Sequence, residues 1–464
     1  MHDVDRRHRV EHGLTAALQI AGRPAEQFTL ADRMARYSVP GVAIAVVDDG
    51  DVEWAAGYGT LGAGRGPVGP AMLFQAASIS KAVAAIGVLA LVEHGVVGLD
   101  DDVNSHLRSW RLPDSEFTVG QPVTLRTLLS HTAGITVPGF PGYAVGTALP
   151  SVLDVLCGTN GANTPAVESF AVPGTVAQYS GGGTTIVQQL ICDVTGREFG
   201  DLMRDLVLVP FGMSDSAYQQ PLAPARQALA AAAHGATGEP LAGNHHVYPE
   251  LQAAGLWTTA IDLAKWVIGV QQVLRGERTG PISQAMAHQM VTRVGVGPFG
   301  LGPEIGGEGP LRRFLHSGRN EGFCTHVDGL VELPSGAAVL TNGDGGTTLC
   351  GEVRRAIAAE YGWGEIGAAP IELADVDPAL LRSYVGRYVG PFDRPMKLEF
   401  ADGELYSPAP YGRRRMLPMS DTTFLDEETG ATLEVAHEAG RVERIAVLVD
   451  GVELMAFVPK EDDR

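Results

Sequence analysis

The chain has 464 residues, of which 45% are hydrophobic and 19% charged, a composition typical of a folded globular protein with two or three domains. Its 34 Lys and Arg residues against 54 Asp and Glu residues give a net charge of −20. This charge argues against nucleic acid or an anionic membrane surface as a partner, and it leaves a small-molecule or peptide substrate. The sequence indicates no oligomeric state.

The N-terminal residues are partly basic but contain no apolar segment typical of a secretory signal. The longest apolar run, residues 82–92, is too short to cross a bilayer. We therefore expect a cytoplasmic protein. Four widely spaced cysteines show no metal-ligand spacing and are predicted to be buried free thiols: Cys157, Cys192, Cys324 and Cys350. The sequence predicts neither a metal nor an organic cofactor.

Most of the chain alternates between strand-like and helix-like patterns. Residues 40–59 hold two β-rich runs around the turn DDGD, which predicts a hairpin. Residues 80–95 predict a buried helix, and residues 123–135 and 178–196 each predict a further helix, the last preceded by a glycine loop. Residues 297–345 return to short strands. Strands at both ends with helices between them predict an α/β (α+β) layered domain.

The pattern changes in the last quarter of the chain. From about residue 371, apolar and polar residues alternate in short segments, and the one helical stretch is the short ALLRSYV. This pattern predicts a small antiparallel β-barrel or sandwich. We therefore expect two domains, residues 1–367 and residues 371–464.

The decapeptide FQAASISKAV, residues 74–83, contains two candidate nucleophilic serines. With 3.6 residues per helical turn, Ser78 and Lys81 share one face, whereas Ser80 points roughly 200° away from Ser78. The helix start also places the Ser78 hydroxyl near unsatisfied N–H groups, which would stabilise a developing oxyanion. Ser78 is therefore the better candidate.

The alternative is that Ser78 only caps the helix and that Lys81 is a surface charge. Ser-x-x-Lys alone is a weak signal. However, an apolar run follows Lys81 at once, which is unusual for a solvated lysine. A buried lysine has a lowered pKa and could accept a proton from a hydroxyl.

Several segments together resemble a known family. FQAASISK resembles the nucleophile motif of the serine β-lactamase and penicillin-binding protein superfamily. ALVEHGVVGLDDDVNSHL, LLSHTAGI, PGTVAQYSGGGTTIVQQLICDVTG, PFGMSDSAY, AAGLWTTAIDLAKW and LHSGRNEGF resemble further landmarks of its class C-like branch, in the expected order over about residues 28–345. That branch includes esterases, D-aminopeptidases and D-amino-acid amidases.

The resemblance implies a fold for each domain. The first would be a β-lactamase-like antiparallel sheet flanked by helices, with a helical subdomain. LRSYVGRYVG resembles the opening of the lipocalin-like barrel that follows this domain in some D-aminopeptidase and esterase relatives. There the barrel can reach over the cleft and restrict entry.

The resemblance also implies a role for each catalytic group. Ser78 would be the acylated nucleophile and Lys81 its proton partner. Tyr179 would match the second-motif tyrosine, which moves protons between nucleophile, lysine and leaving group. His316 would match the first residue of the third motif, which is lysine in class C β-lactamases. The backbone N–H of Arg319 would pair with that of Ser78 as the oxyanion hole.

Two departures bear on the substrate. Gly181 stands where β-lactamases and peptidoglycan carboxypeptidases carry an Asn that holds the acylamino group, and the third-motif lysine is absent. Both changes weaken the case for penicillins or D-Ala-D-Ala ends, and a glycine would leave room for a bulkier, less polar acyl group. We expect four residues to contact the substrate: Gly181, Ser317, Gly318 and Arg319.

Several neighbouring side chains have no assigned role in catalysis. His131 is expected to be structural, through a hydrogen bond at a helix terminus. His245, His246 and residues 248–250 either line the cleft or form a plain loop.

The expected function is a serine hydrolase that forms an acyl-enzyme on Ser78 and cleaves esters or amides of D-residue peptides. One alternative is a penicillin-binding-protein-like thioesterase or peptide cyclase that transfers the acyl group to an amine. Another is weak β-lactamase activity. An alternative of a different class is a non-catalytic binding or assembly protein, which should have lost the serine, the lysine or the tyrosine.

Overall fold

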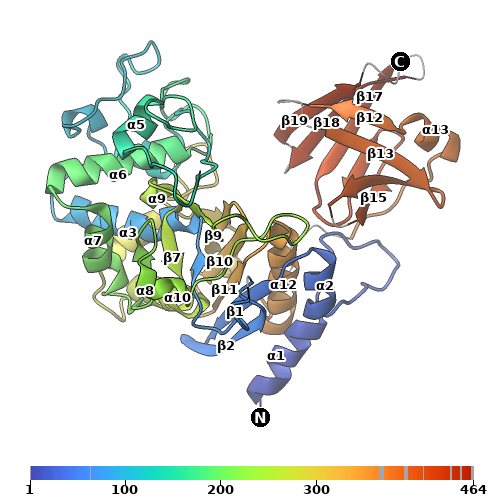
Figure 1. Cartoon of the computed structure of the whole chain (residues 1–464), viewed down its shortest axis with the longest axis horizontal. Coiled ribbons are helices and arrows are strands. Elements are labelled where there is room, and N and C mark those ends of the chain that lie inside the picture. The colour runs from blue at the N-terminus through green and yellow to red at the C-terminus, as the bar shows by residue number, and fades with distance from the viewer. Residues whose placement is uncertain are drawn as a thin grey trace. The chain divides into compact units, whose positions relative to one another are not determined.

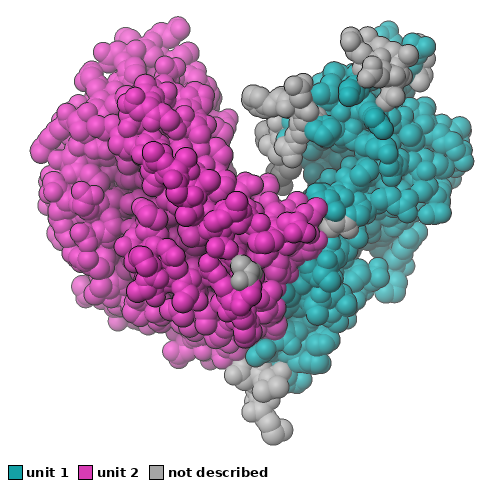
Figure 2. All heavy atoms as spheres, viewed as in Figure 1, with its two compact units in different colours: residues 1–37, 351–464 teal, residues 38–350 magenta. Residues whose placement is uncertain are grey.

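The structure is a computed structural model that describes residues 2–62, 64–364, 370–390, 395–410, 412–438, 441–449 and 452–460. It divides into two compact units, residues 38–350 and residues 1–37 together with 351–464 (Figure 2). The predicted domain boundary between residues 367 and 371 lies largely in 365–369, outside the described residues, and it stays a prediction.

The unit of residues 38–350 is built on an antiparallel sheet of six strands. The predicted hairpin is confirmed: β1 and β2 pair around the turn, and β1 then pairs with β11 from the far end of the unit. Figure 1 shows these strands side by side although they are almost 300 residues apart in sequence. In sheet order the strands are β2 (Asp51–Gly59), β1 (Gly41–Asp48), β11 (Gly336–Thr341), β10 (Phe323–Leu330), β9 (Arg313–Asn320) and β8 (Glu304–Gly306).

Two long helices pack on this sheet. α10 (Ala260–Leu274) contacts β1, β2, β10 and β11, and α3 (Ile79–Glu93) contacts β9 and β10. Trp266 of α10 packs edge-on against Phe314 of β9, with ring centroids 5.5 Å apart. All residues of α3 from Ile79 to Leu91 are buried, which explains why its sequence is apolar on every face. The helix ends before Gly95, whose φ of +69° suits a glycine.

The remaining helices of this unit form the predicted helical subdomain and its connections. α6 (Gly181–Thr195) contacts four shorter helices, and it ends at Gly196 in the left-handed conformation. The other helices are α4 (Leu125–Leu129), α5 (Val152–Cys157), α7 (Phe199–Met203), α8 (Pro224–Gln227), α9 (Leu251–Ala254) and α11 (Gln284–Met290). The short strands are β3 (Phe74–Gln75), β4 (Tyr143–Ala144), β5 (Ala217–Tyr218), β6 (His246–Val247) and β7 (Leu256–Thr258).

The C-terminal region forms a closed barrel of eight antiparallel strands. Of the two predicted architectures, the barrel is confirmed and the sandwich is not. A short helix, α13 (Pro378–Ser383), precedes it. The strands are β12 (Gly386–Val389), β13 (Pro395–Ala401), β14 (Glu404–Ala409), β15 (Gly412–Pro418), β16 (Thr423–Asp426), β17 (Thr432–Glu438), β18 (Arg441–Val449) and β19 (Val452–Pro459).

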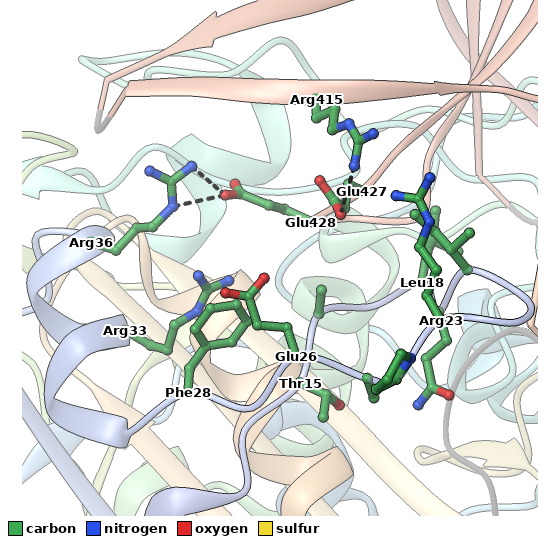
Figure 3. Close-up of a pocket in the computed structure, with 15 residues that line it drawn as sticks. Thr15, Leu18, Arg23, Glu26, Phe28, Arg33, Arg36, Arg415, Glu427 and Glu428 are labelled. Carbon is green, nitrogen blue, oxygen red and sulfur yellow. Dashed lines mark hydrogen bonds and ion pairs between the residues drawn. The ribbon is translucent and has the colours of Figure 1, made fainter. Parts of the chain in front are cut away.

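The N-terminal segment belongs to the same unit as the barrel. It contains α1 (His2–His12) and α2 (Leu30–Arg36), and α12 (Gly346–Tyr361) runs into this unit from the sheet domain. Ile20 bridges to Ile371, and Arg36 pairs with Glu428 at 2.6 Å (Figure 3). These contacts surround a pocket of about 280 Å³, which none of the predicted site residues lines. No helix in the described part of the chain is both long and apolar enough to span a membrane.

Candidate active site

The structure brings Ser78 and Lys81 together at the start of α3. Lys81 Nζ lies 3.1 Å from Ser78 Oγ and also donates a hydrogen bond to Ala253 O at 2.7 Å. Ser78 has helical dihedral angles, and its side chain caps no backbone N–H of the helix. Its hydroxyl therefore faces Lys81 instead of acting as a helix cap, which removes the main structural alternative for this serine.

Burial changes the chemistry of Lys81. Its side chain is 3% exposed, and desolvation lowers the pKa of its amine from 10.5 to about 7. No carboxylate faces the amine among its described hydrogen-bond partners, which are a hydroxyl and a carbonyl. Near neutral pH a large fraction of Lys81 is therefore uncharged and able to accept the serine proton.

The turn before the nucleophile is held tightly against β9. Ala77 has a φ of +50°, and Thr325 Oγ1 donates a hydrogen bond to Ala76 O at 2.8 Å. A Cβ atom on Gly318 would lie 2.3 Å from Ala76 O, so only glycine permits this approach. Ser80 is engaged elsewhere, because its Oγ donates to Ala77 O and accepts the N–H of Leu256.

Tyr179 lies over Lys81, whose Nζ is 5.0 Å from the centre of the phenol ring. Burial raises the pKa of the phenol well above its usual value, and interaction with the Ser78 hydroxyl opposes part of this rise. The phenol oxygen is buried and has no partner of good hydrogen-bond geometry among the described residues. Tyr179 is therefore a neutral phenol that lies next to the serine and the lysine.

His316 is buried close to the phenol, with its ring centroid 6.1 Å from that of Tyr179. Its Nδ1–H donates to Ser317 O at 2.6 Å, so Nε2 carries the lone pair. Burial, assisted by the charge of Lys81, lowers the pKa of His316 to about 3. His316 is thus neutral at physiological pH, and its buried Nε2 has no hydrogen-bond partner in the described part of the chain.

Two aromatic residues complete the wall around Tyr179. His131 stacks on the phenol at 4.3 Å, and its Nδ1 accepts the backbone N–H of Ser180, the N-cap of α6, at 3.2 Å. Phe299 lies 4.7 Å from the His131 ring and 5.8 Å from Tyr179. The hydrogen bond agrees with the structural role expected for His131, but the stacking also makes it a support for Tyr179. No sequence signal pointed to Phe299.

The space expected at Gly181 is filled. A Cβ atom on Gly181 would lie 2.9 Å from the ring of Phe140 and 3.3 Å from Gly139, so the expectation of added room was wrong at this point. The phenyl ring occupies the place that a side chain at Gly181 would need. Ser317 and Arg319 are exposed on β9, on either side of the buried Gly318.

The loop at residues 245–250 contains a buried acid. The hydroxyl of Tyr248 accepts the N–H of Glu321 at 3.0 Å, which fastens the loop to the β9–β10 turn. Glu250 is fully buried, and neither of its oxygens has a hydrogen-bond partner of good geometry in the described chain. Burial raises the pKa of Glu250 to about 7. His245 packs on Trp257 at 5.1 Å, and His246 Nδ1 donates to Pro141 O.

The four cysteines are free thiols, but Cys157 is exposed, so the prediction that they are buried was wrong for this residue. Within the described residues, the group of three side chains close enough to share an ion lies on α1 and consists of His8, Glu11 and His12. None of the residues around Ser78 belongs to it.

The sheet, the helical subdomain and the serine–lysine pair define a β-lactamase-type serine hydrolase fold. The chain belongs to the Beta-lactamase family, whose model matches residues 29–361. Penicillin-binding protein 4 of Amycolatopsis lactamdurans is 32% identical over 39% of this chain and 45% of its own length. Unguisins hydrolase ungD of Aspergillus violaceofuscus is 29% identical over 50% of this chain and 42% of its own length. Each alignment therefore spans less than half of the curated relative.

Solved structures share the fold. The octameric penicillin-binding protein homologue from Pyrococcus abyssi superimposes with a TM-score of 0.60 at 20% identity, over 92% of this chain and 98% of its own. D-alanine carboxypeptidase AmpC from Burkholderia cenocepacia gives a TM-score of 0.57 at 22% identity, over 77% of this chain and 98% of its own. At these identities the likeness concerns the fold alone.

Proposed function

We propose that this protein is a serine hydrolase that forms an acyl-enzyme on Ser78 and cleaves esters or amides of D-residue peptides. The observation that carries the proposal is the distance of 3.1 Å between Ser78 Oγ and the Nζ of a buried lysine whose pKa is about 7. A solvated lysine would be protonated at neutral pH and could not act as a base. The retained serine, lysine and tyrosine speak against the non-catalytic alternative.

The acylation step follows from this arrangement. Neutral Lys81 takes the proton of Ser78 as Oγ attacks the substrate carbonyl carbon, forming a C–O bond. The backbone N–H groups of Ser78 and Arg319 are the proposed donors to the oxyanion. Collapse of the tetrahedral intermediate breaks the bond to the alcohol or amine, which leaves with a proton delivered from Lys81 through the Tyr179 phenol. Water then attacks the acyl carbonyl carbon and gives its proton to Lys81 through the Tyr179 phenol. The bond to Ser78 Oγ breaks, Oγ takes the proton back from Lys81, and the acid is released.

The site also bears on the acyl group. Because His316 is neutral, it cannot pair with a substrate carboxylate as a lysine would. The ring of Phe140 beside Gly181 offers an apolar contact where related enzymes use an amide. Both features favour a neutral, apolar acyl donor over a penicillin. Among the curated relatives, an unguisins hydrolase supports hydrolysis as the reaction.

Covalent labelling tests the nucleophile. Incubation with a fluorophosphonate, followed by intact-mass measurement, should show one adduct on the unaltered protein and none on Ser78→Ala. Ser80→Ala is the matched control, since this serine lies two residues away and is hydrogen-bonded elsewhere. An adduct that persists in folded Ser78→Ala, or that disappears in folded Ser80→Ala, would refute the assignment.

A substrate panel separates hydrolysis from the alternatives. The panel compares p-nitrophenyl butyrate, D-alanine p-nitroanilide, nitrocefin and a linear peptide thioester. Turnover of the first two supports the proposal. Cyclic product from the thioester would instead indicate transfer to an amine, and preferential turnover of nitrocefin would indicate a β-lactamase.

A further inference from the structure

The first helix of the chain, α1 (Figure 1), carries a group of metal-ligating side chains that the catalytic proposal does not use. His8, Glu11 and His12 are spaced i, i+3 and i+4, so they lie on one face of the helix. Each offers one ligand atom, and the three atoms lie within 4.8 Å of one another. Two histidines four residues apart on a helix are zinc ligands in several zinc-enzyme motifs, including H-x-x-E-H, which is the spacing of this segment.

Two of the three ligands already make the hydrogen bonds that orient metal ligands. His12 Nδ1 lies 2.9 Å from His8 O, and a carbonyl can only accept, so Nδ1 carries the proton and Nε2 has the lone pair. Histidines that bind zinc usually donate their second ring N–H in this way. Arg7 Nε donates to Glu11 Oε1 at 2.7 Å, and carboxylates that ligate metals are commonly hydrogen-bonded in the same manner.

The opposite face of α1 is packed into its unit, so the helix that presents these ligands is fixed. Val10 is 1% exposed, and Arg9 donates two hydrogen bonds to the carboxylate of Glu360 on α12, at 2.7 and 2.6 Å. The two histidines, by contrast, are exposed. An ion can therefore reach the group from solvent without movement of the helix.

The arginines of α1 are paired with carboxylates, which reduces their repulsion of a cation. Ion pairs at 3.8, 2.7 and 2.6 Å join Arg6 to Glu360, Arg7 to Glu11 and Arg9 to Asp5. The face of α1 that carries the histidines is thus not opposed by uncompensated positive charge from these three side chains.

The donor set selects the kind of ion. Two imidazole nitrogens and one carboxylate oxygen suit zinc, whereas calcium and magnesium prefer sites built from oxygen ligands. A tetrahedral zinc ion with bonds of about 2.0–2.1 Å holds its ligand atoms roughly 3.4 Å apart. The imidazole rings of His8 and His12 are exposed and 4.0 Å apart between centroids, so rotation of these side chains would bring the ligand atoms to that spacing.

We propose that α1 binds a zinc ion through the imidazoles of His8 and His12 and the carboxylate of Glu11. The fourth position of the tetrahedron would hold water, because the group supplies three ligands. The ion would connect two successive turns of α1 and so stabilise the helix that Arg9 fastens to α12.

Titration calorimetry of the full-length protein with zinc chloride tests this binding. A single site with a dissociation constant in the micromolar range is expected, and calcium chloride should give no binding heat. Each of His8→Ala, His12→Ala and Glu11→Gln should weaken zinc binding about tenfold or more. His94→Ala is the matched control, because His94 is exposed and belongs to no such group in the described chain, so its loss should leave the affinity unchanged. Unchanged zinc affinity in any of the three ligand variants, or no micromolar site in the unaltered protein, would overturn the proposal.

Hydrogen exchange measured by mass spectrometry locates the bound ion independently of these affinities. Zinc should slow the exchange of backbone amides in α1 of the unaltered protein and should have no effect there in His8→Ala. Circular dichroism of the variant without zinc shows whether it is folded. Zinc-dependent protection that appears elsewhere and not in α1 would refute the assignment even if a ligand variant failed to fold.

Discussion

Lys81 should lower the stability of the protein at neutral pH. Its pKa is 10.5 in an unfolded chain and about 7 in the folded protein, so the folded state disfavours the charged amine. The free energy of unfolding is therefore unaffected by this pKa shift above pH 10.5. It falls as the pH is lowered towards 7, where the loss reaches roughly 4 kcal/mol. Lys81→Met keeps an unbranched side chain in the same place and removes this loss.

The same substitution also removes a hydrogen bond. Without the amine, Ala253 O has lost its 2.7 Å donor, and an unsatisfied buried carbonyl costs about 1–3 kcal/mol. At pH 7 the net effect of Lys81→Met is therefore a stabilisation of about 1–3 kcal/mol. Above pH 10.5 the lysine is neutral in both states, so the variant should be the less stable protein. The sign of the difference should reverse between these pH values.

Urea unfolding followed by tryptophan fluorescence measures this reversal. Four of the five tryptophans lie in the unit of residues 38–350, which contains Lys81, so the signal reports on the correct part of the molecule. Lys265→Met is the matched control, because Lys265 is partly exposed and pairs with the buried Asp262 at 2.9 Å. That variant should be destabilised at pH 7. If Lys81→Met were destabilised to the same extent at pH 7 and above pH 10.5, the inference of a discharged lysine would be wrong.

Three further outcomes are expected. The rate of fluorophosphonate labelling should rise about tenfold between pH 6 and pH 8 and then level off, following the pKa of Lys81; a rise that continues to pH 10 would contradict this. Burial raises the pKa of Glu250 to about 7, so the stabilisation by its neutral carboxyl group is fully present below pH 4.5 and is lost as the pH rises through 7. Glu250→Gln does not titrate. Between pH 5 and pH 8 its free energy of unfolding, measured with urea, should therefore rise by roughly 2–3 kcal/mol relative to that of the unaltered protein. Gly318→Ala should cost about 1–3 kcal/mol and abolish labelling, whereas Gly235→Ala, where a Cβ atom has space, should do neither.

Local patterns predicted the elements that carry the chemistry. The spacing of Ser78 and Lys81 and the apolar run after them can be interpreted from helix geometry alone. The helix that they predict is α3, which begins directly after Ser78. The glycines before α6 and the turn between β1 and β2 are local signals of the same kind. For the same reason the sequence predicted which serine faces the lysine.

Contacts between distant segments could not be predicted in this way. Phe299 reaches Tyr179 from a loop 120 residues further along the chain, and no periodic pattern marks it. Phe140 fills the space beside Gly181 because the loop of residues 137–139 lies against the start of α6. The composition of the sequence does not predict this contact. The degree of burial, which sets the pKa of both Lys81 and His316, likewise depends on the tertiary packing.

The protonation states of Lys81 and His316 depend on each other. The charge of Lys81 lowers the pKa of His316, and both side chains are buried, so the folded protein resists holding two cations there. When Lys81 accepts the serine proton, it becomes a cation in a desolvated site, and this is unfavourable unless a negative charge appears nearby. The oxyanion of the tetrahedral intermediate supplies that charge at the same moment. Burial of Lys81 thus destabilises the resting protein, and the same burial makes the pair of opposite charges most favourable at the tetrahedral stage of the reaction.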